Sequence, residues 1–179
     1  FIQHEFSERG WTGELKATSG DYLEVVNTNI GGGKTDAAIQ EIIHHQADIS
    51  ADGSVVDTVT ITRLHTGTSA DQFANVKNVN YLRLYVPAGS ELITAEGFIQ
   101  PEASLFLPVE AGYTQDADLV AVTGEVVVDG VTQTRISQEF GKTVFGNWIQ
   151  TEPGESSTVT MRYRLPFKVE RTSWTPGRY

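Results

Sequence analysis

The sequence predicts a mainly β protein, and three observations lead to that class. Short segments alternate apolar and polar residues and are rich in valine, isoleucine and threonine, which suits strands with one face in water. Turn dipeptides such as Asp-Gly and Pro-Gly separate these segments. Helical periodicity is nearly absent after residue 10. About eight to ten strands at such spacings predict an antiparallel β-sandwich, Ig-like or jelly-roll-like, with a short N-terminal helix.

Residues 1–20 are expected to form a short helix and a lead-in to the first strand. Apolar residues at the start of the chain share one helical face with Phe6, and Gly10 is suited to end the turn. Residues 21–179 are expected to form the sandwich domain, which is long enough to bury a sizeable core. We expect the chain to be a fragment of a longer protein.

The first strands are expected at residues 22–26 and in a long β-hairpin. Residues 37–50 fit both a helix and a strand, because their isoleucines recur at spacings compatible with either. Asp52-Gly53 then provides a hairpin turn, and residues 55–66 are rich in β-branched side chains. The turn and the second segment favour the hairpin.

Later segments show a clearer alternation of apolar and polar residues. Three of them place these residues on one face: Leu82, Leu84 and Val86; Val120, Val122, Val126 and Val128; Val159, Met161, Tyr163 and Leu165. Asp129-Gly130 is the signature of a tight hairpin. Two more strands are expected in "VTQTRISQ" and "KTVFGNWIQ". Residues 66–79 are expected to be an exposed connection, and residues 97–118 a loop with one short strand.

Charge and composition exclude several classes of function. The formal charge of −10 spreads along the chain, so we expect no binding to nucleic acid or to an anionic membrane surface. The sequence has no cysteine, which removes disulfides, thiolate zinc sites and a cysteine nucleophile. No apolar run approaches the roughly 20 residues that span a bilayer. Contact with a membrane is therefore expected only through a segment outside this chain.

A glycine-rich segment resembles half of a phosphate-binding loop. Gly33, Lys34 and Thr35 fit the second half of the pattern G-x-x-x-x-G-K-[ST]. Thr28 occupies the position of the first glycine, where a β-branched residue adopts the required backbone conformation only at considerable cost. The nearest acidic partner for magnesium, Asp129, lies in the hairpin turn. We interpret the segment as a turn between two strands and expect neither a nucleotide nor another cofactor.

Histidines and loop carboxylates raise the question of a metal. His44 and His45 point to opposite faces if they lie on a strand, so they do not readily share one ion. A zinc site would require His45, His65 and an acid to converge across the hairpin, and ligand geometry seldom permits this. Two sets of loop acids match no calcium-loop spacing: Asp116 and Asp118 with Glu110, and Asp48 with Asp52. We expect no metal.

The sequence predicts no catalytic residue. The patterns G-x-S-x-G, S-x-x-K and H-E-x-x-H are absent. A pair of glycosidase carboxylates needs only to be close in space, so sequence alone does not test for one. Aromatic side chains that could stack on sugar rings suggest three ligand-binding residues: Trp148, Trp174 and Tyr179. The competing interpretation is that Trp11 and Trp148 are core residues.

Four stretches of the chain carry a resemblance to a known family. They are "GWTGEL" (10–15), "GDYLEVVNTNIGGGKTD" (20–36), "YLRLYVPAGSELI" (81–93) and "FGKTVFGNWIQTEPGESSTVTMRYRLP" (140–166). In this order they resemble the C-terminal region of a family of large bacterial proteins of unknown function. The resemblance implies a membrane-anchored, extracytoplasmic protein of the cell envelope. It implies no catalytic residue, because none is established for that family.

Together these expectations describe a non-catalytic extracytoplasmic module that positions or links parts of an envelope protein. Its expected partners are other envelope proteins or glycans. The alternative is a carbohydrate-binding module that acts on cell-wall or exopolysaccharide glycans, and a hydrolase is a distant third. A contiguous aromatic strip on one sheet would favour glycan binding. A cleft with two close carboxylates would favour the enzyme.

Overall fold

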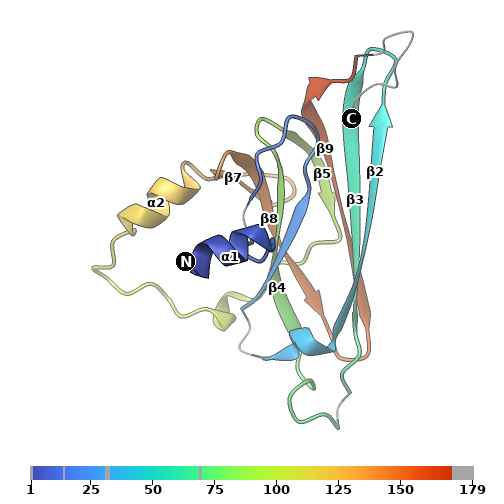
Figure 1. Cartoon of the computed structure of the whole chain (residues 1–179). Helices are drawn as coiled ribbons and strands as arrows, with labels where there is room; N and C mark the ends of the chain where they lie inside the picture. Colours follow the sequence, from blue (N-terminus) through green and yellow to red (C-terminus); the bar gives the residue numbers. More distant parts are fainter. Residues whose placement is uncertain (1, 14, 31–32, 69, 171–179) are drawn as a thin grey trace.

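The computed structural model describes residues 2–13, 15–30, 33–68 and 70–170. In these residues two antiparallel sheets pack face to face, which confirms the predicted mainly β sandwich (Figure 1). Sheet A has the strand order β1-β4-β8-β7-β6, and sheet B has the order β2-β3-β9-β5. No helix in the described part of the chain is long and apolar enough to cross a membrane.

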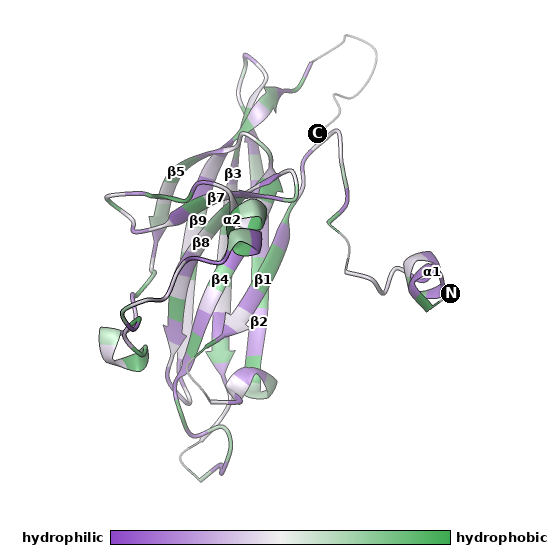
Figure 2. Cartoon of the chain, turned by 90° about the vertical axis from the view of Figure 1, so that its left-hand side faces the viewer, coloured by the Kyte–Doolittle hydropathy of each residue, from purple (hydrophilic) through white to green (hydrophobic). Residues whose placement is uncertain are grey.

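Nine strands and four short helical segments make up the described part of the chain. The strands are β1 (Glu24–Asn29), β2 (Ile39–Ile49), β3 (Ser54–His65), β4 (Asn78–Pro87), β5 (Glu91–Glu96), β6 (Val127–Val128), β7 (Arg135–Glu139), β8 (Lys142–Thr151) and β9 (Ser156–Lys168). The α-helices are α1 (Ile2–Glu8) and α2 (Ala117–Thr123), and the 3-10 helices are η1 (Thr35–Ala38) and η2 (Ala103–Leu105). The predicted short N-terminal helix is present, and Figure 2 shows it standing clear of both sheets.

The ambiguous segment 37–50 is a strand, and the predicted long hairpin is confirmed. β2 and β3 pair over their whole length, with Ile43 opposite Ile61 and Ile49 opposite Val55. Gly53 takes a φ of 83° in the turn, where a Cβ would lie 2.4 Å from a backbone oxygen. The turn residues, which sequence reasoning recognised, thus decide between helix and strand here.

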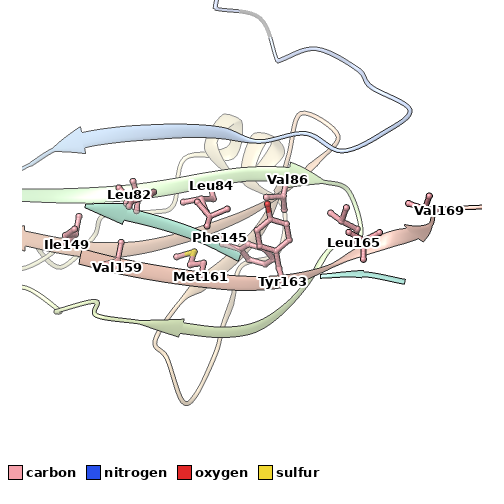
Figure 3. Close-up of a cluster of buried hydrophobic side chains, with 13 residues drawn as sticks. Leu82, Leu84, Val86, Phe145, Ile149, Val159, Met161, Tyr163, Leu165 and Val169 are labelled. Carbon is pink, nitrogen blue, oxygen red and sulfur yellow. The ribbon is translucent and has the colours of Figure 1, made fainter. Parts of the chain in front are cut away.

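The core lies between the two sheets and contains the faces that alternation predicted (Figure 3). The predicted residues that are buried there are Leu82, Leu84, Val86, Val159, Met161, Tyr163 and Leu165. Phe145 of β8 meets Tyr163 of β9 across the interface, with ring centroids 5.7 Å apart. Complete burial of one such side chain stabilises the fold by about 1.5–3 kcal/mol.

The strand expected around residues 119–128 is wrong for most of its length. Residues 117–123 form α2, and only the last two residues of the segment pair with β7. Asp116 caps the helix, because its carboxylate accepts the backbone N–H groups of Asp118 at 2.8 Å and Leu119 at 3.2 Å. Gly124 ends it with a positive φ. These two caps outweigh the alternating valines. A turn that starts at the predicted Asp129 connects β6 to β7, but it spans residues 129–134 and is wider than the tight hairpin expected, so β7 begins at Arg135 and not at residue 131.

The long connection between β5 and β6 covers part of the outer face of sheet A. Residues 97–118 contain η2 and no strand among their described residues, so the short strand expected there is wrong. The Ile99 N–H donates to the Trp148 carbonyl at 3.0 Å, and the Phe106 ring packs on the Trp148 ring at 5.4 Å. Figures 1 and 2 show α2 over the same face of the sheet. The connection therefore encloses space above β7 and β8.

Candidate functional site

The outer face of sheet A carries polar and aromatic side chains, because they alternate with the core residues of the same strands. β4 contributes Tyr81, Arg83 and Tyr85, and β7 contributes Arg135, Ser137 and Glu139. In the strand register, Arg83 and Arg135 lie on either side of Gly146 of β8. Neighbouring strands are about 4.8 Å apart, so the backbones of the two arginines are about 10 Å apart.

The glycine between the arginines leaves room above the sheet. A Cβ on Gly146 would lie 2.2 Å from the Tyr81 hydroxyl, so the tyrosine ring lies across the glycine. Leu119 and Thr123 of α2 form the opposite wall. The result is a pocket of about 220 Å³. Pockets that enclose a drug-sized ligand measure roughly 300–1,000 Å³, so this pocket suits a single ring or a small charged group.

A hydrogen-bonded group orders one end of the pocket. Tyr85 donates to Glu139 Oε2 at 2.7 Å, and Ser137 donates to Glu139 Oε1 at 2.8 Å. Arg83 Nη1 donates to the Tyr85 hydroxyl at 3.0 Å and lies 3.7 Å from Glu139 Oε2. Burial, followed by the hydrogen bond to Glu139, raises the pKa of Tyr85 to about 12. Tyr85 therefore stays protonated, and Glu139 serves to hold Arg83 in place.

Both arginines line the pocket, and the side chain of Arg83 is 31% exposed there. Arg83 Nε is buried and has no hydrogen-bond partner among the described residues. Arg135 is exposed, and its guanidinium lies beside the Tyr81 hydroxyl. Burial raises the pKa of Tyr81, and the two arginines oppose that shift. Because a guanidinium presents a planar fork of donors that matches a carboxylate or a phosphate, the pocket is suited to an anionic group.

The sequence predicted one residue near this pocket and missed the residues that line it. Trp148 is half-buried on the outer face of β8, with its ring 4.9 Å from that of Tyr81, and stands next to the pocket. Trp174 and Tyr179 lie outside the described residues. Trp11 is 67% exposed, so the core interpretation of this residue is wrong. Alternation placed the arginines on a polar face, but no sequence signal placed α2 above them.

The glycine-rich segment connects β1 to β2 through η1, as expected for a turn between strands. Thr35 is fully buried, and its hydroxyl accepts hydrogen bonds from Asn29 Nδ2 at 3.2 Å and Asn78 Nδ2 at 2.9 Å. A threonine that binds magnesium beside a phosphate must instead turn its hydroxyl toward the ligand. The Thr35 hydroxyl instead accepts hydrogen bonds inside the sandwich.

A cluster around Arg63 fills part of the opening between the edge strands β1 and β2. The guanidinium is buried, with Nη2 3.5 Å from Asp36 Oδ1 and Nη1 3.6 Å from Glu41 Oε2. Asn27 of β1 accepts a hydrogen bond from Arg63 and donates to both carboxylate oxygens of Glu41 at 3.1 Å. Burial lowers the pKa of Arg63, and the two carboxylates oppose this, so the group remains charged.

A second cluster lies around His45 in the same opening. His45 Nε2 is 3.4 Å from Asp57 Oδ2 and 3.7 Å from Asp21 Oδ2. The hydrogen bond to Asp57 raises the pKa of His45, and burial opposes the shift. His65, which a zinc site confined to the hairpin would also require, does not join this cluster. His65 is buried elsewhere, where Nδ1 accepts the Gly67 N–H and Nε2 donates to a carbonyl, both at 3.1 Å.

Comparison of this chain with protein-family models, curated proteins and solved structures finds no match. The fold and the site define its class as a two-sheet antiparallel β-sandwich with an arginine-lined pocket on the outer face of one sheet.

Proposed function

We propose that this chain is a non-catalytic, extracytoplasmic module of a bacterial envelope protein that binds an acidic glycan. One observation carries the proposal: Arg83 and Arg135 flank Gly146 beneath Tyr81, in a pocket that α2 encloses. Two guanidinium groups in one small pocket match the carboxylate or phosphate of an acidic sugar polymer. The envelope setting rests on the family resemblance of the four stretches.

Aromatic side chains beside the pocket support a sugar as the carrier of that anionic group. The rings of Tyr81, Trp148 and Phe106 form a contiguous series of tilted contacts, with successive centroids 4.9 and 5.4 Å apart. Phe106 is 39% exposed and Trp148 is half-buried, so part of this strip faces solvent. Aromatic faces offer apolar area next to polar groups, a combination that suits the two sides of a sugar ring.

The arrangement of carboxylates favours binding over hydrolysis. A retaining glycosidase places two carboxyl groups about 5–5.5 Å apart on either side of the sugar in an open cleft. In the pocket, Glu139 is already bound by Tyr85, Ser137 and Arg83. The net charge of −10 repels acidic polymers at long range, so recognition depends on the short-range contacts of the two arginines.

Calorimetric titration with an acidic polymer tests the proposal. Polygalacturonic acid and a teichoic acid supply the carboxylate and the phosphate, and dextran supplies a neutral reference. Arg135→Gln is expected to weaken binding about tenfold or more, because it removes a charge-assisted hydrogen bond. Gly146→Ala is expected to abolish binding, because the added methyl group meets the Tyr81 hydroxyl at 2.2 Å.

Arg162→Gln is the matched control, since Arg162 is an exposed arginine on β9 of the other sheet. It should bind like the unsubstituted chain. Equal binding by Arg135→Gln, or equal affinity for dextran, would overturn the proposed site. Absence of binding to either acidic polymer would instead favour a module that links parts of an envelope protein without holding glycan.

A further inference from the structure

We propose that Asp21, His45 and Asp57 form a site for a first-row divalent metal ion such as Zn²⁺, with Tyr163 as a neighbouring oxygen donor. The proposal is independent of the glycan pocket, because the residues lie in the opening between β1 and β2 and none of them lines that pocket.

The spacing of the ligand atoms is close to that of a tetrahedral site. Around an ion with bonds of about 2.1 Å, neighbouring tetrahedral ligands are about 3.4 Å apart. His45 Nε2 lies 3.4 Å from the oxygen of Asp57 and 3.7 Å from that of Asp21. One ligand atom from each of the three residues lies within 4.8 Å of the others. Closure around an ion therefore requires only small side-chain movements.

Three separate elements bring these ligands together. In the hairpin register Asp57 lies opposite Ala47, so His45 is its diagonal neighbour on the same face of sheet B. Asp21 comes from the lead-in to β1 of sheet A. Asp57 is completely buried, whereas the side chain of His45 is 26% exposed. An ion could reach the site from the His45 side, and would then join the lead-in to the hairpin.

The buried hydroxyl of Tyr163 is a second observation in favour of the site. It lies directly opposite Asp57 in the β3–β9 register, and its side chain is completely buried. Its hydroxyl oxygen has no hydrogen-bond partner among the described residues. Because residues directly opposite one another on neighbouring strands point to the same face, the Tyr163 side chain lies beside Asp57 in the interior. A metal ion or its bound water would give this oxygen a partner.

The chemistry of the donors selects the kind of ion. One imidazole nitrogen and carboxylate oxygens suit zinc and its first-row neighbours. Calcium requires six to eight oxygen ligands and does not favour an imidazole. The sequence argument against a metal considered His44, His45 and His65 within one hairpin. It did not consider Asp21, which reaches the cluster from outside the hairpin.

Isothermal titration of the metal-free chain with ZnCl₂ and with CaCl₂ tests the proposal. We expect one saturable zinc site and much weaker binding of calcium. His45→Gln and Asp21→Asn should each weaken zinc binding at least about tenfold, since even supporting residues of metal sites have effects of that size. His44→Gln is the matched control, because this neighbour on β2 points to the other face of the strand. Asp21 lies outside the strands, so its variant tests the site without altering the hairpin.

Amide hydrogen exchange provides a second test. Zinc that bound only to one exposed histidine would not give the result expected here. Zinc should slow amide exchange in residues 20–24 and 44–46 together in the unsubstituted chain, and should fail to do so in Asp21→Asn. The absence of saturable zinc binding would overturn the site. So would equal losses in His44→Gln and His45→Gln, equal affinity for calcium, or unchanged zinc binding in Asp21→Asn.

Discussion

Two charged clusters occupy the same opening between the sheets, yet their central groups differ. Arg63 brings a permanent positive charge and a fork of donors, which Asp36, Glu41 and Asn27 engage. His45 brings one small ring that is charged only when protonated, and it stands between two carboxylates. The Arg63 cluster centres on a cation that stays charged, whereas the His45 cluster centres on a ring whose charge depends on pH.

The edge strands explain why charges lie between the sheets at all. Among the described strands, β1 and β2 each pair with a neighbour on one side only, and Asn27 between them is exposed. Asn27 crosses this opening and hydrogen-bonds to Glu41 of β2. Apolar side chains fill the middle of the sandwich, and polar side chains close its edge. Substitutions in the two clusters should therefore have different signs and sizes.

The largest effect on stability is expected from Arg63→Met, which removes the buried guanidinium of this cluster. Arg63 is buried, but Asp36 is more than half exposed and is partly compensated by water, so we expect the free energy of unfolding to fall by about 2 kcal/mol. Urea unfolding measures the change. Arg162→Met, at an exposed arginine on β9, is the control and should stay within about 0.5 kcal/mol of the unsubstituted chain. Equal effects of the two variants would show that the Arg63 cluster contributes nothing specific.

A smaller effect of opposite sign is expected from Tyr163→Phe in the metal-free chain. The hydroxyl is buried and has no hydrogen-bond partner in the described part of the chain, so its removal should raise the free energy of unfolding by about 1 kcal/mol. In Tyr85→Phe, by contrast, the lost hydroxyl is bonded to Glu139 and Arg83, and stability should fall by about 1 kcal/mol. Thermal or urea unfolding in a chelating buffer compares the two variants. A decrease in both would argue that the Tyr163 hydroxyl already has a partner.

The smallest effect is expected at an exposed ion pair that joins the β2–β3 turn to the end of β9. Lys168 Nζ lies 2.6 Å from Asp52 Oδ2, and this hydrogen bond, followed by those from Ser54, holds the pKa of Asp52 well below its usual range. The native carboxylate thus releases its proton more readily than the unfolded one. Its stabilising contribution is present above the unfolded pKa of about 3.9 and is lost as the pH falls through the lower folded value.

Lys168→Met should therefore raise the pKa of Asp52, as measured by NMR titration of its carboxyl carbon. Both side chains are more than half exposed, so the unfolding midpoint at pH 7 should change little. An unchanged pKa would show that Ser54 alone accounts for the shift. The effects of Lys168→Met and Arg63→Met on stability, taken together, compare an ion pair in water with one inside the sandwich.

Local patterns in the sequence predicted much of the fold. Alternation in residues 81–86 and 157–165 identified their buried faces, because side-chain direction along a strand depends only on the backbone of that strand. Asp52-Gly53 identified the β2–β3 hairpin, because the turn conformation is also local. The same logic failed at residues 117–123, where alternating valines suggested a strand. There the caps at Asp116 and Gly124 were the better local signal.

The sequence by itself determined the fold class, the turns and the inward faces of the central strands, since each depends on residues close together in the chain. Only the tertiary structure decided which outward residues meet. Arg83, Gly146 and Arg135 come from three strands, and Asp21, His45 and Asp57 from three segments. Their proximity depends on the register between strands that are not consecutive in sequence. That register is set by the packing of whole sheets and the closure of long loops, which no short segment encodes.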